Sequence, residues 1–295
     1  MNGLRTWVEV NETALRHNAE QFLRLIPEHT KFMAVVKSNA YGHGLAQIAK
    51  RLTNFSCFAG HRRSLWFGVD SIVEALRLRK EGIKNPTLIL GATLPERLPE
   101  STANDITVTI SSFEALEAVR ALNRPPPFHL KIDTGMHRQG FQMNDLRRLT
   151  ASLQHFRVKP SGIYTHFSAA KDPADTTATR AELNEFQHVT DALRTAGLRD
   201  FLMHAAATGG TLIMPDAHLD MVRIGIGLYG CWPSEELAAA YRANPDITLR
   251  PTLSWKTIIA EVKTIPVGSK IGYDGTESVG RVTTMAVLPI GYWHG

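Results

Sequence analysis

The segment FMAVVKSNAYGHG, residues 32–44, begins with five apolar residues and becomes polar at Lys37. A short apolar run that contains β-branched residues predicts a strand buried on both faces. The polar residues and glycines that follow predict a loop at the end of this strand. A lysine at such a strand end is either a nucleophile that faces a buried cavity or a solvated surface charge, and its position alone leaves both open.

Short apolar runs of this kind recur along the chain and alternate with amphipathic, helix-like segments. Eight strand–helix repeats within roughly 230 residues predict a (β/α)8 TIM barrel, an α/β fold whose typical length is about 250 residues. On the pattern alone, a doubly wound open sheet remains the alternative. The strands are expected at residues 32–36, 65–69, 87–90, 106–110, 128–132, 162–166, 201–204 and 221–224, and the clearest helices at residues 11–25, 71–81, 111–122 and 175–196.

The pattern changes near the C-terminal end, where prolines mark a linker-like stretch and alternating, glycine-punctuated strands follow. We therefore expect a barrel in residues 1–232 and a partial, mostly β domain in residues 233–295. Because the chain stops directly after an apolar strand, this second domain is expected to be incomplete, as in a chain truncated at its C-terminus. Its strands are expected at residues 252–264, 270–273 and 281–288.

Composition and charge exclude several classes of protein. The net charge is +5, but lysine and arginine are scattered rather than gathered in a patch, so we expect no nucleic-acid partner. No run of 18 apolar residues and no signal-peptide core is present, so we expect no membrane association. Two isolated cysteines, Cys57 and Cys231, fit a reducing cytoplasm. The histidines at 43, 137 and 204 lack metal-site spacing, so no metal is expected.

Polar side chains follow several of the expected strands. In a TIM barrel the reactive residues lie at the carboxyl ends of the strands, on one rim. Lys37 follows the first strand, Arg138 lies in the loop after the fifth, His166 ends the sixth and Arg223 lies in the eighth. The turns after strands seven and eight are rich in glycine, which is typical of backbone sites for phosphate. These residues predict a cationic site for a small anionic molecule.

The stretch AVVKSNAYGHG, residues 34–44, resembles the pyridoxal 5′-phosphate (PLP) lysine signature of the alanine racemases, which are fold-type III PLP enzymes. The resemblance covers nearly the whole chain and favours the barrel over the open sheet. It implies an isomerase that interconverts L- and D-alanine as a homodimer, and so supplies D-alanine for peptidoglycan precursors. The other matching segments are KIDTGMHRQGF at 131–141, GIYTHFS at 162–168, MVRIGIGLYG at 221–230 and IGYDGT at 271–276.

The resemblance also implies roles for single residues. Lys37 would hold PLP as a Schiff base and, once released, serve as one of two catalytic bases. Tyr273 of the partner chain would be the second base, on the opposite face of the substrate, and His166 would hydrogen-bond that tyrosine. Arg223 would face the pyridine nitrogen of PLP and keep it unprotonated, because an arginine does not give up its proton.

Further residues match the binding of substrate and cofactor in the family. Arg138 would lie near the PLP phenolate and bind the substrate carboxylate. Lys131 matches a lysine that is carbamylated in some members and steadies that arginine. Judged without the resemblance, Tyr273 could be an ordinary turn aromatic and Thr208 a helix cap. The residues that match phosphate contacts are Tyr41, Thr208, Gly225 and Ile226.

The chain departs from the family pattern at several positions. Ala207-Thr208 stands where members usually have Asn-Ser, and His137 stands where glycine usually precedes the arginine, so His137 must tolerate any left-handed backbone there. Residues 291–295 lack an acidic residue, and members continue through more strands. Two alternatives therefore remain: a PLP-binding protein or truncated homologue without racemase turnover, and a racemase of broader specificity for serine or basic amino acids.

Overall fold

The computed structural model describes residues 3–58, 65–154, 157–243 and 246–294. The chain forms two compact units: residues 12–252, and residues 1–11 together with 253–295. This division differs from the expected boundary at residues 232 and 233. The first eleven residues belong with the C-terminal strands because Thr6–Val10 pair with Leu253–Thr257, and residues 233–252 stay with the larger unit.

The larger unit is a closed barrel of parallel strands. Within the described residues, two four-stranded sheets have the orders β4-β3-β2-β9 and β5-β6-β7-β8. Backbone bonds join them at both edges: Thr107 N–H donates to Thr87 O at 2.9 Å, and Arg223 N–H donates to Ala206 O at 3.0 Å. The TIM-type barrel expected from the sequence is thereby confirmed. Its strands are β2 (Lys31–Val35), β3 (Leu65–Val69), β4 (Thr87–Ile89), β5 (Val108–Ile110), β6 (Phe128–Lys131), β7 (Gly162–Tyr164), β8 (Leu202–His204) and β9 (Met221–Ile224).

Strands of this barrel are buried along nearly their whole length, which explains their apolar composition. All four residues of β9 are buried, and so are all four of β6. Met33, Leu88 and Met221 pack together inside the barrel, against Trp66 and Leu90. Such burial on both faces is what a parallel strand covered by helices requires.

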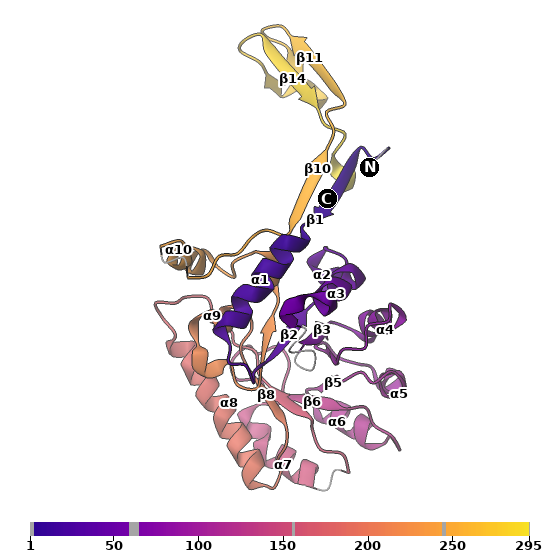
Figure 1. Cartoon of the computed structure of the whole chain (residues 1–295), viewed down its shortest axis with the longest axis vertical. Coiled ribbons are helices and arrows are strands. Elements are labelled where there is room, and N and C mark those ends of the chain that lie inside the picture. Colours follow the sequence, from indigo (N-terminus) through magenta and orange to yellow (C-terminus); the bar gives the residue numbers. More distant parts are fainter. Residues whose placement is uncertain (1–2, 59–64, 155–156, 244–245, 295) are drawn as a thin grey trace. The chain divides into compact units, whose positions relative to one another are not determined.

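Helices surround the strands of this unit (Figure 1). Their buried residues recur at helical spacing, for example Leu15, Ala19 and Phe22 in α1. The Ser112 hydroxyl caps α6. Within the described residues, no helix is long and apolar enough to cross a membrane. The helices are α1 (Glu12–Leu25), α3 (Leu45–Asn54), α4 (Ile72–Lys80), α5 (Leu98–Ala103), α6 (Phe113–Arg120), α7 (Leu146–Gln154), α8 (Thr177–Thr195), α9 (Thr208–Ile213) and α10 (Glu235–Ala243).

The smaller unit consists of antiparallel strand pairs. β1 (Thr6–Val10) pairs with β10 (Leu253–Thr257), and β11 (Glu261–Ile265) pairs with β14 (Thr283–Val287). The expectation of a single strand over residues 252–264 is wrong, because the chain changes its pairing partner between β10 and β11. A third, shorter pair is β12 (Lys270–Ile271) with β13 (Glu277–Ser278).

Candidate active site

A cavity of about 600 Å³ lies at the carboxyl ends of the barrel strands. The structure brings to it every residue of the barrel that the sequence singled out. Tyr273 belongs to the smaller unit, in a short turn (Tyr273–Gly275), and is 89% exposed. The singled-out residues that line the cavity are Lys37, Tyr41, Lys131, Arg138, His166, Thr208, Arg223, Gly225 and Ile226.

Lys37 opens a left-handed turn, labelled α2 (Lys37–Tyr41). Ser38, Asn39 and Ala40 have φ angles of 54–55° and ψ angles of 42–50°, and Tyr41 has φ 52°. A left-handed turn of non-glycine residues costs roughly 1–2 kcal/mol per residue, because each Cβ approaches a carbonyl oxygen. The chain therefore stores strain directly after its candidate nucleophile, and other contacts must hold the turn.

Aromatic side chains support this turn from the interior. The Tyr229 hydroxyl donates a hydrogen bond to Val35 O at 3.0 Å, at the end of β2. The ring of Tyr41 packs on Tyr229 with centroids 5.1 Å apart, and the ring of His43 lies 4.5 Å from the same tyrosine. Tyr229 thus fixes both the strand before Lys37 and the residues after it.

The amine of Lys37 lies 3.6 Å from a carboxylate oxygen of Asp70, and both side chains are partly exposed. Asp70 follows β3 directly and also lines the cavity. Asp70 was not among the residues predicted from the sequence, although the signal was present, since it is a charged residue immediately after a predicted barrel strand. The cavity therefore contains an acid that faces the candidate nucleophile.

Arg223 is the most constrained side chain of the site. Its Nη2 donates to Thr165 O at 2.8 Å and to Ala205 O at 2.7 Å, and its Nη1 lies 2.9 Å from His204 Nδ1. Burial lowers the pKa of Arg223 to about 10, so the guanidinium is still charged at neutral pH. Strand ends β7 and β8 thus hold a permanent cation at one place in the cavity wall.

The donors of Arg223 fix which nitrogen carries the proton in His204 and, through it, in His129. A guanidinium only donates, so His204 Nδ1 must accept and its Nε2 must carry the proton. That Nε2 lies 2.9 Å from Nδ1 of His129, which therefore accepts in turn. Burial, followed by the charge of Arg223, lowers the pKa of His129 and of His166 to about 3 and that of His204 well below its usual range. All three imidazoles are neutral at neutral pH.

The ring of Tyr164 packs against His204 and Arg223. Its ring stacks on His204 with centroids 4.7 Å apart and planes at 7°, and its hydroxyl lies 2.9 Å from Thr109 Oγ1. Burial raises the pKa of Tyr164 to about 12, so the phenol stays protonated. The amine of Lys131 lies 5.7 Å from the ring centroid.

Lys131 is a buried amine among other cations. Burial, then the charges of Arg138 and Arg223, lower the pKa of Lys131 to about 8. Its Nζ lies 3.4 Å from Gln139 Oε1, and that amide in turn donates to Ser111 Oγ at 3.1 Å. A substantial fraction of Lys131 is therefore uncharged near pH 8 and available as a nucleophile.

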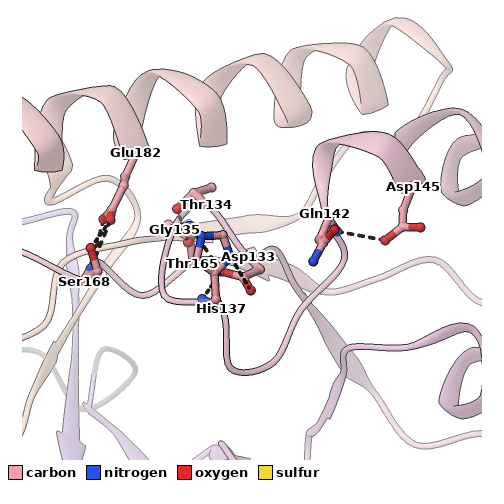
Figure 2. A network of polar contacts seen from close by, with 9 residues as sticks. All are labelled: Asp133, Thr134, Gly135, His137, Gln142, Asp145, Thr165, Ser168 and Glu182. Atoms are coloured by element: carbon pink, nitrogen blue, oxygen red, sulfur yellow. Dashed lines mark hydrogen bonds and ion pairs between the residues drawn. The ribbon is translucent and has the colours of Figure 1, made fainter.

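The loop that carries Arg138 is held by a buried carboxylate (Figure 2). Asp133 Oδ1 accepts hydrogen bonds from the N–H of Gly135 at 3.2 Å and of His137 at 2.9 Å. His137 has φ 50°, so this histidine does adopt the left-handed backbone that glycine favours. The aspartate thus offsets strain one residue before Arg138.

A second carboxylate steadies the loop after β7. Glu182 of α8 accepts hydrogen bonds from the hydroxyl and the N–H of Ser168, the latter at 3.0 Å (Figure 2). Nearby, the hydroxyls of Thr134 and Thr165 lie 2.7 Å apart. These contacts tie the loops after β6 and β7 to each other and to α8, on either side of His166.

A glycine-lined wall completes the cavity. Thr208 Oγ1 accepts hydrogen bonds from the N–H groups of Gly225 at 3.2 Å and Gly227 at 3.4 Å. A Cβ on Gly209 would lie 1.9 Å from Ala170 O, and one on Gly225 would lie 2.8 Å from the Tyr41 hydroxyl. At Gly209 the clash is with backbone, so only glycine fits there. Glycine-rich turns of this kind are typical of sites for small anions such as phosphate.

A TIM barrel with an amine, a buried arginine and a glycine-lined wall on one rim defines an enzyme of small anionic molecules. Residues 10–233 match the family model described as the alanine racemase N-terminal domain, and residues 252–295 match its C-terminal domain. The chain belongs to the alanine racemase family.

Relatives and solved structures agree with this assignment. The chain is 35% identical to alanine racemase 1 of Oceanobacillus iheyensis, over 98% of this chain and 75% of the relative. The structure of alanine racemase from Clostridium difficile 630 superposes with a TM-score of 0.87 at 30% identity, covering 99% of this chain and 75% of that one. The enzyme from D-cycloserine-producing Streptomyces lavendulae gives 0.86 at 31%, over 99% and 75%. The activity of this chain is that of an alanine racemase, an isomerase.

Proposed function

We propose that the chain racemises alanine with PLP bound in the barrel cavity, using Lys37 and the Tyr273 of a partner chain as two bases. The observation that carries the proposal is the convergence of the Lys37 amine, Arg223 and the glycine-lined wall on one cavity. Its volume of about 600 Å³ lies within the range of about 300–1,000 Å³ that is typical for sites of small ligands.

The residues present fit PLP. Lys37 would bind the aldehyde carbon, Tyr41, Thr208, Gly225 and Ile226 would contact the phosphate, and Arg223 would face the ring nitrogen, beside His166. The glycines are supporting evidence, because a Cβ at Gly209 would lie 1.9 Å from Ala170 O, and one at Gly225 would lie 2.8 Å from the hydroxyl of Tyr41, a proposed phosphate contact. When bound, PLP withdraws electrons from the α-carbon of an amino acid and makes its hydrogen acidic.

The protein's own groups then have distinct tasks. The Lys37 amine would take or return the proton on one face of the α-carbon, and the Tyr273 hydroxyl would do so on the other. Arg138 would orient the substrate carboxylate with its planar fork of donors. Arg223, fixed by the carbonyls of Thr165 and Ala205, would present a cation that cannot lose its proton at neutral pH.

We further propose that Lys131 is carbamylated. In that reaction the neutral amine attacks CO2, its nitrogen loses one proton, and the resulting carbamate is an anion that would pair with Arg138. The lowered pKa of about 8 supports the proposal, because only the uncharged amine reacts. A homodimer follows from the role given to Tyr273, whose 89% exposure leaves it available to another chain. D-alanine supply for peptidoglycan precursors in the cytoplasm remains a prediction.

Subunit complementation tests this assignment. Lys37→Ala and Tyr273→Phe should each be inactive, and a mixture of the two unfolded and refolded together should regain activity. Random pairing would restore about one quarter of the wild-type sites, because half of the dimers are hybrids with one intact site. Conversion of L-alanine to D-alanine is the measurement, with L-serine and L-lysine as substrate controls. A mixture without activity would refute sites shared between chains.

A further inference from the structure

One carboxylate holds the strained turn after Lys37 from outside the cavity. Glu74, in the first turn of α4, accepts the N–H of Asn39 on Oε1 at 2.9 Å and the N–H of Asp70 on Oε2 at 2.9 Å. Its two oxygens therefore tie the loop after β2 to the loop after β3.

The turn needs such a contact. Residues 38–41 all have the left-handed backbone, and a right-handed turn would be the default for their side chains. The Asn39 N–H lies in the middle of this stretch, and a hydrogen bond to a carboxylate is stronger than one to a neutral acceptor. Asn39 contributes in its turn, because its Oδ1 accepts the N–H of Leu45 at 2.9 Å.

Glu74 also affects the Lys37 amine indirectly, through Asp70. Asp70, whose N–H Glu74 accepts, has a carboxylate oxygen 3.6 Å from Lys37 Nζ. Glu74 thus fixes the backbone next to Lys37 and also the acid that faces its amine. Glu74 itself is not among the described residues that line the cavity, so it has no contact with a substrate there.

We propose that Glu74 is a positioning residue for racemisation: its carboxylate holds the left-handed turn that aims the Lys37 amine into the cavity. This inference rests on the proposed role of Lys37. Glu74 lies outside the segments that resemble the family motifs, and its place in α4 gives no local sign of a contact with Asn39, 35 positions earlier.

Glu74→Gln tests the inference, because an amide keeps one acceptor oxygen and replaces the other with a donor. We expect kcat to fall about 10- to 100-fold with KM within about threefold, the scale of a misplaced reacting group. The rate at which borohydride fixes PLP to Lys37 should fall by a similar factor. In cofactor-free protein, hydrogen exchange at the Asn39 amide should become faster. The matched control is Glu81→Gln at the C-cap of the same helix, whose carboxylate forms ion pairs with Lys50 and Arg77.

A glycine should rescue the variant. Ser38→Gly removes the Cβ that clashes in a left-handed backbone. The double variant Glu74→Gln/Ser38→Gly should therefore have a kcat at least about fivefold higher than that of Glu74→Gln alone. Ser38→Gly alone completes the double-mutant cycle. A carboxylate that merely stabilises α4 would lower the melting temperature without rescue by a glycine in another loop. Should Glu74→Gln fail to fold, Glu74→Asp, which retains the charge but shortens its reach, takes its place in the same cycle.

Two results would overturn the inference: wild-type kcat and fixation rate in Glu74→Gln, or a loss that Ser38→Gly does not reduce. Peptide mapping of the borohydride-treated protein separates this failure from failure of the proposed function. If PLP is fixed to Lys37 at the same rate in wild type and variant, only the role of Glu74 is wrong. If PLP is fixed to another lysine, the proposed role of Lys37 is wrong and the inference falls with it.

Discussion

The barrel unit and the strand unit of this chain differ in how far each is constrained by its own residues. In the barrel, β9 is buried at all four positions, and its Arg223 has hydrogen bonds to the ends of two other strands, β7 and β8. In the strand unit, four of the five residues of β11 are exposed, and Tyr273 is 89% exposed. The difference shows that one proposed base, Lys37, is held by the fold of its own chain, whereas the other, Tyr273, lies on an exposed surface.

The largest expected effect sets the two proposed bases against each other. Lys37→Ala should lower kcat by about 10⁴-fold or more and abolish the visible absorbance of bound PLP, because it removes the group that holds the cofactor. Tyr273→Phe should lower kcat by about 10³-fold but leave that absorbance intact. D-alanine formation and the absorbance spectrum are the two measurements. Loss of the absorbance in Tyr273→Phe would break the distinction between the units.

A second prediction compares the stability that each unit gains from one residue. Arg223→Met leaves two buried carbonyls without their donor and should lower the free energy of unfolding by about 2–6 kcal/mol, at about 1–3 kcal/mol for each carbonyl. Tyr273→Ala removes an exposed ring and should change the free energy by no more than about 0.5 kcal/mol. Urea denaturation followed by far-UV circular dichroism measures both. Equal effects would show that Tyr273 is packed within its own chain.

A third prediction follows from the neutral histidines of the barrel. The folded chain keeps His129 unprotonated down to a pKa of about 3, whereas the unfolded chain binds a proton from about 6.5 downward. Stability is therefore lost as pH falls from about 6.5 to 3, by roughly 1.4 kcal/mol per pH unit for this group. His129→Asn, which retains an acceptor, should flatten the pH dependence of unfolding by that slope. The exposed His188 supplies the control, and a His188→Asn variant should keep the wild-type slope.

The smallest expected effect concerns Lys131. Because carbamylation consumes the neutral amine, whose pKa is about 8, added bicarbonate should stimulate activity about twofold near pH 8 and less near pH 6.5. Lys131→Met should lose this stimulation. Lys159 follows α7 and donates to the carbonyls of the last two residues of that helix, and Lys159→Met should retain the stimulation. Stimulation that persists in Lys131→Met would refute the carbamate at this residue.

The sequence predicted the barrel well because its signals are local. Each parallel strand is buried on both faces, so an apolar run of four or five residues marks it, and the expected bounds lie within about two residues of those of β2 to β9. β1 was missed because its partner β10 lies 243 to 251 positions away along the chain, and five alternating residues next to the N-terminus give no local sign of that pairing.

The site could be predicted only in part, for two reasons. Lys37, Arg138, His166 and Arg223 stand at or beside strand ends, where position in the sequence translates directly into position in the fold. The left-handed turn has no counterpart in its residues, since serine and alanine have no preference for that backbone. Contacts such as Glu74 with Asn39, or His129 with His204, join segments 35 and 75 positions apart, and only the folded backbone brings them together.

The left-handed turn also limits which sequences this position of the chain can accept. A β-branched side chain clashes most severely at positive φ, and proline cannot adopt it at all. Libraries randomised at Ser38 and Asn39 and selected for growth without external D-alanine should therefore yield glycine, asparagine and aspartate often. Valine, isoleucine, threonine and proline should be almost absent. The residue types missing from the selected sequences would then report the left-handed backbone of this turn.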